Sequence, residues 1–202
     1  MSRTEERMFN GIELGREFFA KLTAIDEAMV VEAAAGACAR CGGPLHRGDY
    51  PRKPRGGRIA VAGEAFDRRF SLCCGREGCR KRATPPSVRF LGRRVYVGGA
   101  VIVASVIAMA ATAARAGVRA TGIAARTTRR WLRWWRGSFT ATSVFVQICA
   151  RLVPAVERRS LPASILERVD GEPHQRVARL LGWLAPITTC SANGSRLVRG
   201  AV

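Results

Sequence analysis

Acidic residues are scarce in this chain. Its 202 residues include 15 Asp and Glu against 34 Lys and Arg, which gives a formal net charge of +19. Self-repulsion of this size disfavours a compact state, so the charge predicts a polyanionic partner. Nucleic acid is the first candidate and an anionic membrane surface the second. A genomic bias toward Arg and Ala is the alternative source of part of the excess.

Acids are absent altogether between Gly78 and Val156. Most of them lie toward the two ends of the chain, and composition bias alone would not sort the signs in this way. The sorting predicts a basic central surface that serves as an electrostatic footprint for a polyanion. The basic residues of the acid-free stretch are Arg80, Lys81, Arg82, Arg89, Arg93, Arg94, Arg115, Arg119, Arg126, Arg129, Arg130, Arg133, Arg136 and Arg151.

The N-terminus lacks the apolar run of a secretory signal, because MSRTEERMFNGIELGREFF carries acids there. The cysteine pattern also argues against a disulfide framework, since the number is odd and the spacing uneven. We therefore expect a cytoplasmic protein with reduced thiols, in which clustered cysteines bind metal. The seven cysteines are at positions 38, 41, 73, 74, 79, 149 and 190.

Two cysteine pairs have the spacing of metal ligands. Cys38 and Cys41 are two residues apart and are followed by glycines, which permit a tight turn and leave backbone N–H groups free to bond sulfur. Cys74 with Cys79 is the preferred second pair, and Cys73 or His46 is the alternative ligand. Four thiolates leave no open position for water, so the pattern predicts one structural Zn²⁺.

The hydrophobic pattern favours an α+β fold that is mostly α. Gly11 to Ala35 is an expected amphipathic helix, with Phe18, Leu22, Ile25, Met29 and Val30 at helical spacing and Glu17, Lys21, Asp26 and Glu27 between them. Short strands are expected at 68–72, 88–90 and 95–97, and helices from 100 and at 124–137, 141–153, 160–169 and 173–184. The predicted units are 1–36, an N-terminal helix; 37–97, a zinc ribbon; 98–153, helix-turn-helix-like helices; 154–190, short helices; and 191–202, a disordered tail.

The run from Val95 to Ala114 contains no charged residue. Its length is compatible with a membrane anchor. Its many small residues, and the lack of a second span, fit a buried helix of a helical domain as well. A membrane-associated protein is therefore one alternative to a nucleic-acid binder.

Two stretches carry candidate phosphate contacts. Arg52, Lys53 and Arg55 lie in a Pro- and Gly-rich loop between the cysteine pairs, and Arg80, Lys81 and Arg82 follow the last ligand. In the expected helix after Gly122, Thr128, Trp131, Leu132 and Trp135 form one stripe. The opposite side gathers Arg126, Arg129, Arg130, Arg133 and Arg136, which are expected to meet nucleic acid. The polar N-terminal residues Arg126, Thr127, Arg129 and Arg130 are the ones expected to touch a groove.

The layout of Cys38-Ala-Arg-Cys41-Gly42, then Arg69-Phe70-Ser-Leu-Cys-Cys with Cys79-Arg-Lys-Arg-Ala-Thr, then an apolar helix, resembles the N-terminal zinc ribbons of bacterial insertion-sequence transposases. Gly122 to Trp135 is similar to the recognition half of their helix-turn-helix. The whole chain resembles short bacterial proteins that travel with mobile elements. We therefore expect the ribbon and the arginine helix to clamp DNA, mostly through its phosphates, and the resemblance adds a transposase or recombinase as a second partner.

The chain departs from those transposases in its carboxylates. Their catalytic domain uses three separated carboxylates, whereas after Glu77 this chain has only Glu157, Glu167, Asp170 and Glu172, all close together. We therefore expect no enzymatic activity and a regulatory or accessory role. A zinc-stabilised protein–protein adaptor is the other alternative.

Overall fold

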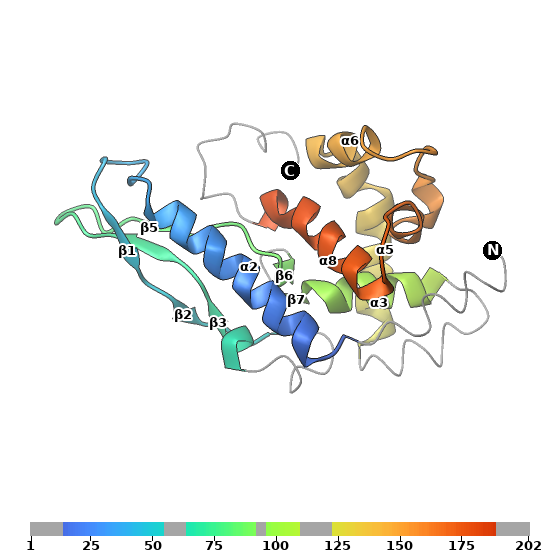
Figure 1. The fold of residues 1–202 in the computed structure, drawn as a ribbon, viewed down its shortest axis with the longest axis horizontal. Coiled ribbons are helices and arrows are strands. Elements are labelled where there is room, and N and C mark those ends of the chain that lie inside the picture. The colour runs from blue at the N-terminus through green and yellow to red at the C-terminus, as the bar shows by residue number, and fades with distance from the viewer. Residues whose placement is uncertain (1–13, 55–63, 92–95, 110–122, 189–202) are drawn as a thin grey trace.

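The structure is a computed structural model that describes residues 14–54, 64–91, 96–109 and 123–188. The fold is α+β, with small antiparallel sheets and a larger helical part, as the hydrophobic pattern predicted. Figure 1 shows the strands β1 to β5 at one end of the long axis and the helices α3, α5 and α6 toward the other. The predicted tail at 191–202 lies outside the described residues.

One long antiparallel hairpin forms the β-rich end. Strand β1 (Leu45–Arg47) pairs with β4 (Leu72–Cys74), and β2 (Tyr50–Pro51) pairs with β3 (Arg68–Arg69). The register is the same in both pairs, and the Gly48 N–H donates to the Ser71 carbonyl between them at 2.8 Å. Strand β5 (Arg82–Ala83) adds to the free edge of β4 and completes a sheet of order β1-β4-β5.

Helix α2 (Arg16–Ala34) joins the two ends of the molecule. Its 19 residues span about 28 Å at 1.5 Å per residue. Phe18 and Leu22 near its start are buried in the large helical core, whereas Val30 near its end is buried with Phe70 and Leu72 of the hairpin. The predicted helix is confirmed from residue 16, and residues 11–13 lie outside the described part.

The helical part packs around α3 (Gly98–Met109), which contacts both α5 (Ala125–Arg136) and α8 (Pro173–Leu184). Ile102, Trp135 and Leu180, one from each helix, are fully buried. The remaining elements are the 3₁₀ helices η2 (Glu64–Asp67), η3 (Ser138–Ala141), η4 (Arg158–Ser160) and η5 (Ala185–Thr188), the strands β6 (Phe90–Leu91) and β7 (Tyr96–Val97), and the helices α6 (Ser143–Cys149) and α7 (Ala163–Leu166).

Helix α8 has the predicted bounds because its start is strongly marked. Pro173 occupies the first turn, and Glu172 and Gln175 form a reciprocal capping box. The helix predicted at 160–169 is shorter than expected. A 3₁₀ turn ends at Ser160, and the segment then contains only the four-residue α7, whose residues are all buried, so tertiary packing rather than helical periodicity decides its length.

Residues 98–109 of the apolar run form α3, which is largely buried in the protein. Within α3, Val101, Ile102 and Ser105 are buried, and the Ser105 hydroxyl accepts a hydrogen bond from Trp135 Nε1 at 3.2 Å. Among the residues that the structure describes, no helix is both long and apolar enough to cross a membrane. Positions 95 and 110–114 of the run are not among them.

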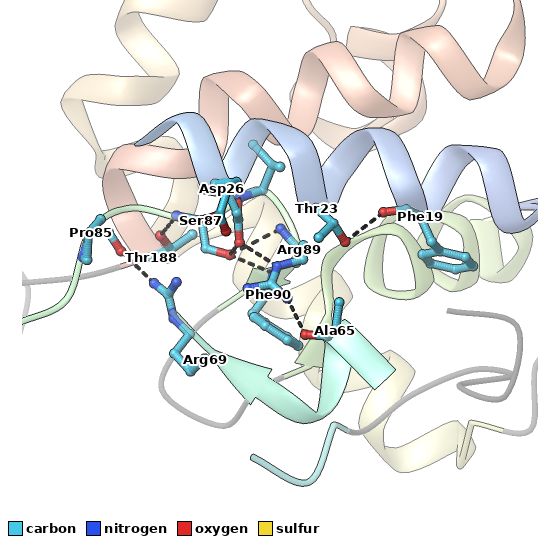
Figure 2. A network of polar contacts seen from close by, with 12 residues as sticks. Phe19, Thr23, Asp26, Ala65, Arg69, Pro85, Ser87, Arg89, Phe90 and Thr188 are labelled. Atoms are coloured by element: carbon cyan, nitrogen blue, oxygen red, sulfur yellow. Dashed lines mark hydrogen bonds and ion pairs between the residues drawn. The ribbon is translucent and has the colours of Figure 1, made fainter. Parts of the chain in front are cut away.

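A buried ion pair ties α2 to the segment before β6, and the sequence analysis missed it (Figure 2). Asp26 accepts hydrogen bonds from the Ser87 hydroxyl at 2.6 Å, the Val88 N–H at 2.7 Å and Arg89 Nε at 2.7 Å. The Arg89 guanidinium also lies 3.8 Å from the centre of the Phe70 ring. Assigning Arg89 to a basic surface is therefore wrong, as is assigning Asp26 to the polar face of its helix.

Candidate metal centre

Four cysteine sulfurs meet at the end of the hairpin. The Sγ atoms of the cysteines at 38, 41, 74 and 79 all lie within 4.8 Å of one another. The Cys38 and Cys79 sulfurs are 3.8 Å apart, and those of Cys41 and Cys74 are 3.5 Å apart. A tetrahedral ion with metal–sulfur bonds near 2.3 Å holds its ligands about 3.8 Å apart. The four thiols are therefore close enough together to coordinate one metal ion.

The first pair of cysteines sits in a tight loop before β1. The N–H groups of Cys41 and Gly42 both donate to the Cys38 carbonyl, at 3.2 and 2.8 Å. Gly42 has a φ of +69°, which glycine adopts without strain. A Cβ at Gly43 would lie 3.1 Å from the Cys74 sulfur, so a side chain there would press on a ligand atom.

The second pair sits in a longer loop between β4 and β5, which ends in the same hydrogen-bonded turn as the first loop. The Cys79 and Arg80 N–H groups both donate to the Arg76 carbonyl, at 3.1 and 3.5 Å. The Arg76 N–H donates to the Cys74 sulfur at 3.4 Å, and its guanidinium donates to the Cys41 carbonyl at 3.0 Å. Arg76 thus links the two loops and stabilises negative charge on sulfur.

The surroundings move the pKa values of two thiols in opposite directions. The backbone N–H of Arg40 lowers the pKa of Cys38 to about 7, because it stabilises the thiolate. Burial raises the pKa of Cys74 to about 12. A metal cation bound at the centre would offset the cost of burying the Cys74 thiolate, because it would bind the thiolate forms of Cys74 and Cys38.

Neither alternative ligand joins the group of four. Cys73 alternates with Cys74 along β4, so its side chain lies on the other face of the strand, and its sulfur contacts the Arg80 carbonyl at 3.3 Å. His46 is the cross-strand partner of Cys73, and its ring fills the space that a Cβ on Gly75 would need. The structure therefore brings together the preferred set of ligands.

The basic residues of the hairpin divide into two groups. The Arg52 guanidinium lies 5.1 Å from the centre of the Tyr50 ring. Arg82 donates to the Ser71 hydroxyl at 2.6 Å, and its guanidinium lies 4.9 Å from the centre of the same ring. Both are thus engaged within the hairpin. Lys53, Arg80 and Lys81 are exposed, and Arg55 lies outside the described residues.

Helix α5 presents the predicted arginine face. Thr128, Trp131 and Trp135 are buried, whereas Leu132 and Thr127 are half-buried. Arg130 donates to the Tyr96 hydroxyl at 2.8 Å, and Arg136 donates to the Arg159 carbonyl at 3.1 Å. The exposed residues that we call the α5 face are Arg126, Arg129, Arg130, Arg133 and Arg136, and within the described part of the chain none of them pairs with a carboxylate.

The cysteine loops carry two exposed cations that the sequence analysis did not select, Arg40 and Arg76. Both lie between the cysteines of a pair, and that position is the signal that could have identified them. The hairpin and α5 occupy opposite ends of the long axis (Figure 1). Comparisons with protein-family models, with curated proteins and with solved structures found no match to this chain.

Proposed function

We propose that the chain is a zinc-ribbon protein in which one structural Zn²⁺ is held by Cys38, Cys41, Cys74 and Cys79. The sulfur spacing and the N–H group directed at Cys74 support this. Thiolate ligands in a tetrahedral set are typical of Zn²⁺, and four of them leave the ion without a site for substrate. The metal's role is then to fix the two cysteine loops, not to take part in a reaction.

The proposed activity is nucleic-acid binding through the phosphate backbone, with duplex DNA as the target. The observation that carries it is the α5 face, whose guanidiniums are exposed and make no ion pair in the described residues. Its opposite side is anchored by Trp131 and Trp135, so the arginines stand on a rigid helix. Such a face fits phosphates, which specify position rather than sequence.

A salt titration of DNA binding tests this proposal. Arg129 and Arg133 are suitable residues to replace, because their side chains, unlike those of Arg130 and Arg136, make no hydrogen bond to the described part of the protein. The double variant Arg129→Ala/Arg133→Ala removes two phosphate contacts, so the plot of log K against log salt becomes shallower by about 2. Folding is unaffected, because both side chains are exposed.

The matched control is Arg179→Ala, which removes an equally exposed arginine from α8. The control keeps the slope of the wild-type chain. An unchanged slope in the double variant would reject the α5 face as the binding site, and a wild-type chain that ignores DNA at low salt would reject the function.

The same proposal includes an accessory role beside a transposase or recombinase, which rests on the resemblance of the cysteine loops and α5 to parts of such proteins. The turn at Gly122 that a helix-turn-helix requires lies outside the described residues. Competition between element-end and random duplexes tests the role, because a regulator of an element prefers its ends. Equal affinity for both would limit the function to non-specific binding.

A further inference from the structure

The backbone of the second cysteine loop is strained at one residue. Arg80 has a φ of +44°, and among the described residues it is the one non-glycine residue with a positive φ. Gly42 holds the equivalent place in the first loop, since its N–H makes the same bond, four residues back, that the Arg80 N–H makes. The fold therefore favours glycine at position 80, and the chain has arginine there.

No stabilising contact among the described residues around Arg80 explains why arginine rather than glycine occupies this position. Its side chain is exposed and makes no ion pair in the described part of the chain. Residues in such conformations are held there by the surrounding structure and are concentrated at functional sites. Three further exposed cations lie in or directly after the same two loops, namely Arg40, Arg76 and Lys81, against one acid, Glu77. We call these four cations with their loops the metal-centre tip.

We propose that the metal-centre tip is a second phosphate-binding surface, and that one molecule bridges two separate segments of duplex DNA. This inference rests on the proposed function, because the α5 face supplies the first segment. The tip and α5 lie at opposite ends of the long axis, with α2 between them (Figure 1). Because the two surfaces are separated along the molecule, each can hold its own segment of duplex, and this bridge differs from the clamp on one segment that the sequence analysis expected.

The two surfaces differ in how strongly they attract DNA. The thiolates of an occupied metal centre and Glu77 offset most of the charge of the four tip cations, whereas the α5 face has five arginines and no nearby ion pair in the described residues. Electrostatic attraction to a phosphate backbone grows with the number of phosphates neutralised. The α5 face therefore holds the first duplex, and the tip captures the second one more weakly.

A capture experiment with the full zinc-loaded chain tests the bridge. One duplex is immobilised, the protein is bound to it, and a fluorescent second duplex is added at low salt. The variant Arg40→Ala/Arg80→Gly is expected to keep its affinity for the first duplex within twofold and to lose about tenfold in capture of the second. Arg80→Gly alone does not lower the unfolding temperature, because glycine adopts this φ without strain.

Arg179→Ala is the control for loss of one exposed positive charge, and it keeps full capture. Capture that is unchanged in Arg40→Ala/Arg80→Gly would overturn the inference, because the bridge would then come from α5 faces of associated copies. A wild-type chain that binds the first duplex without capturing a second would also overturn it, while the proposed function would stand. Failure to bind the first duplex would reject both.

Discussion

The two ends of this molecule are stabilised in different ways. In the helical part, Ile102, Trp135 and Leu180 belong to one large core to which every long helix contributes. Among the described residues of the hairpin, Phe70 and Leu72 form a small separate cluster with Val30 of α2 and a few half-buried neighbours. A core this small does not offset the entropy of ordering the loops around it. This comparison predicts that folding of the hairpin depends on the proposed metal ion, and that folding of the helical part does not.

Of the predictions that test this difference between the two ends, the loss of one cysteine ligand has the largest expected effect. Cys41→Ser removes a thiolate from the centre, so the chain releases its zinc and the cysteine loops unfold. Structural Zn²⁺ sites in small domains contribute apparent binding free energies of roughly 10–16 kcal/mol. Hydrogen exchange followed by mass spectrometry is expected to show loss of protection in 38–51 and 68–83, with α5 and α8 still protected. Full metal occupancy in the variant would refute the assignment.

The second prediction concerns the junction of the two ends. Asp26→Ala leaves Arg89 charged, buried and unpaired, and it also removes the acceptor of the Ser87 and Val88 bonds. Breaking a buried pair in this way costs roughly 3–5 kcal/mol. We expect chemical denaturation to show that the free energy of unfolding falls by this amount. Both the hairpin and the helical part should become more exposed to solvent.

Glu27→Ala is the matched control, since Glu27 is the next residue of the same helix and pairs with Arg47 at the surface. The two side chains of that pair are 43% and 42% exposed, so its loss costs less than about 1 kcal/mol. Equal effects of the two substitutions would show that the buried pair does not hold the ends together.

The smallest expected effect is the pH dependence of zinc affinity, which distinguishes the protonation states of the individual thiols. Binding requires thiolates, so affinity rises with pH by up to about tenfold per unit for each proton released. The pKa of Cys38 is lowered to about 7, so this thiol releases its proton on binding below that pH and has none to release above it. The pKa of Cys74 is raised to about 12, so it releases a proton throughout.

Competition with a chelator between pH 6 and pH 8 measures the slope. Fewer protons are expected to be released per zinc above pH 7, by about one. A slope that is constant across this range would contradict the thiolate character assigned to Cys38.

Spacing and periodicity predicted the parts of the molecule that local sequence determines. The preferred cysteine set, the buried stripe of α5 and the bounds of α8 are of this kind, because two residues between ligands, helical spacing and a capping box are local features. Asp26 and Arg89 were misassigned for the opposite reason. Each has the charge typical of a surface residue, and only the tertiary approach of α2 to the segment before β6 gives them a partner.

The cations of the metal-centre tip were predicted only in part, for a similar reason. Arg80 and Lys81 were found as a charge run, but Arg40 joins them only when the two cysteine loops meet. The strain at Arg80 is a property of the folded backbone, and no residue pattern could reveal it.

Metal analysis of two neighbouring variants tests the central claim most directly. Cys73 and Cys74 are adjacent in β4, but only the Cys74 sulfur lies among the four clustered thiols. We predict one zinc ion per chain in the purified wild-type protein and in Cys73→Ser, and none in Cys74→Ser. A metal-free wild-type protein, or the same zinc content in Cys74→Ser as in the wild type, would contradict the account.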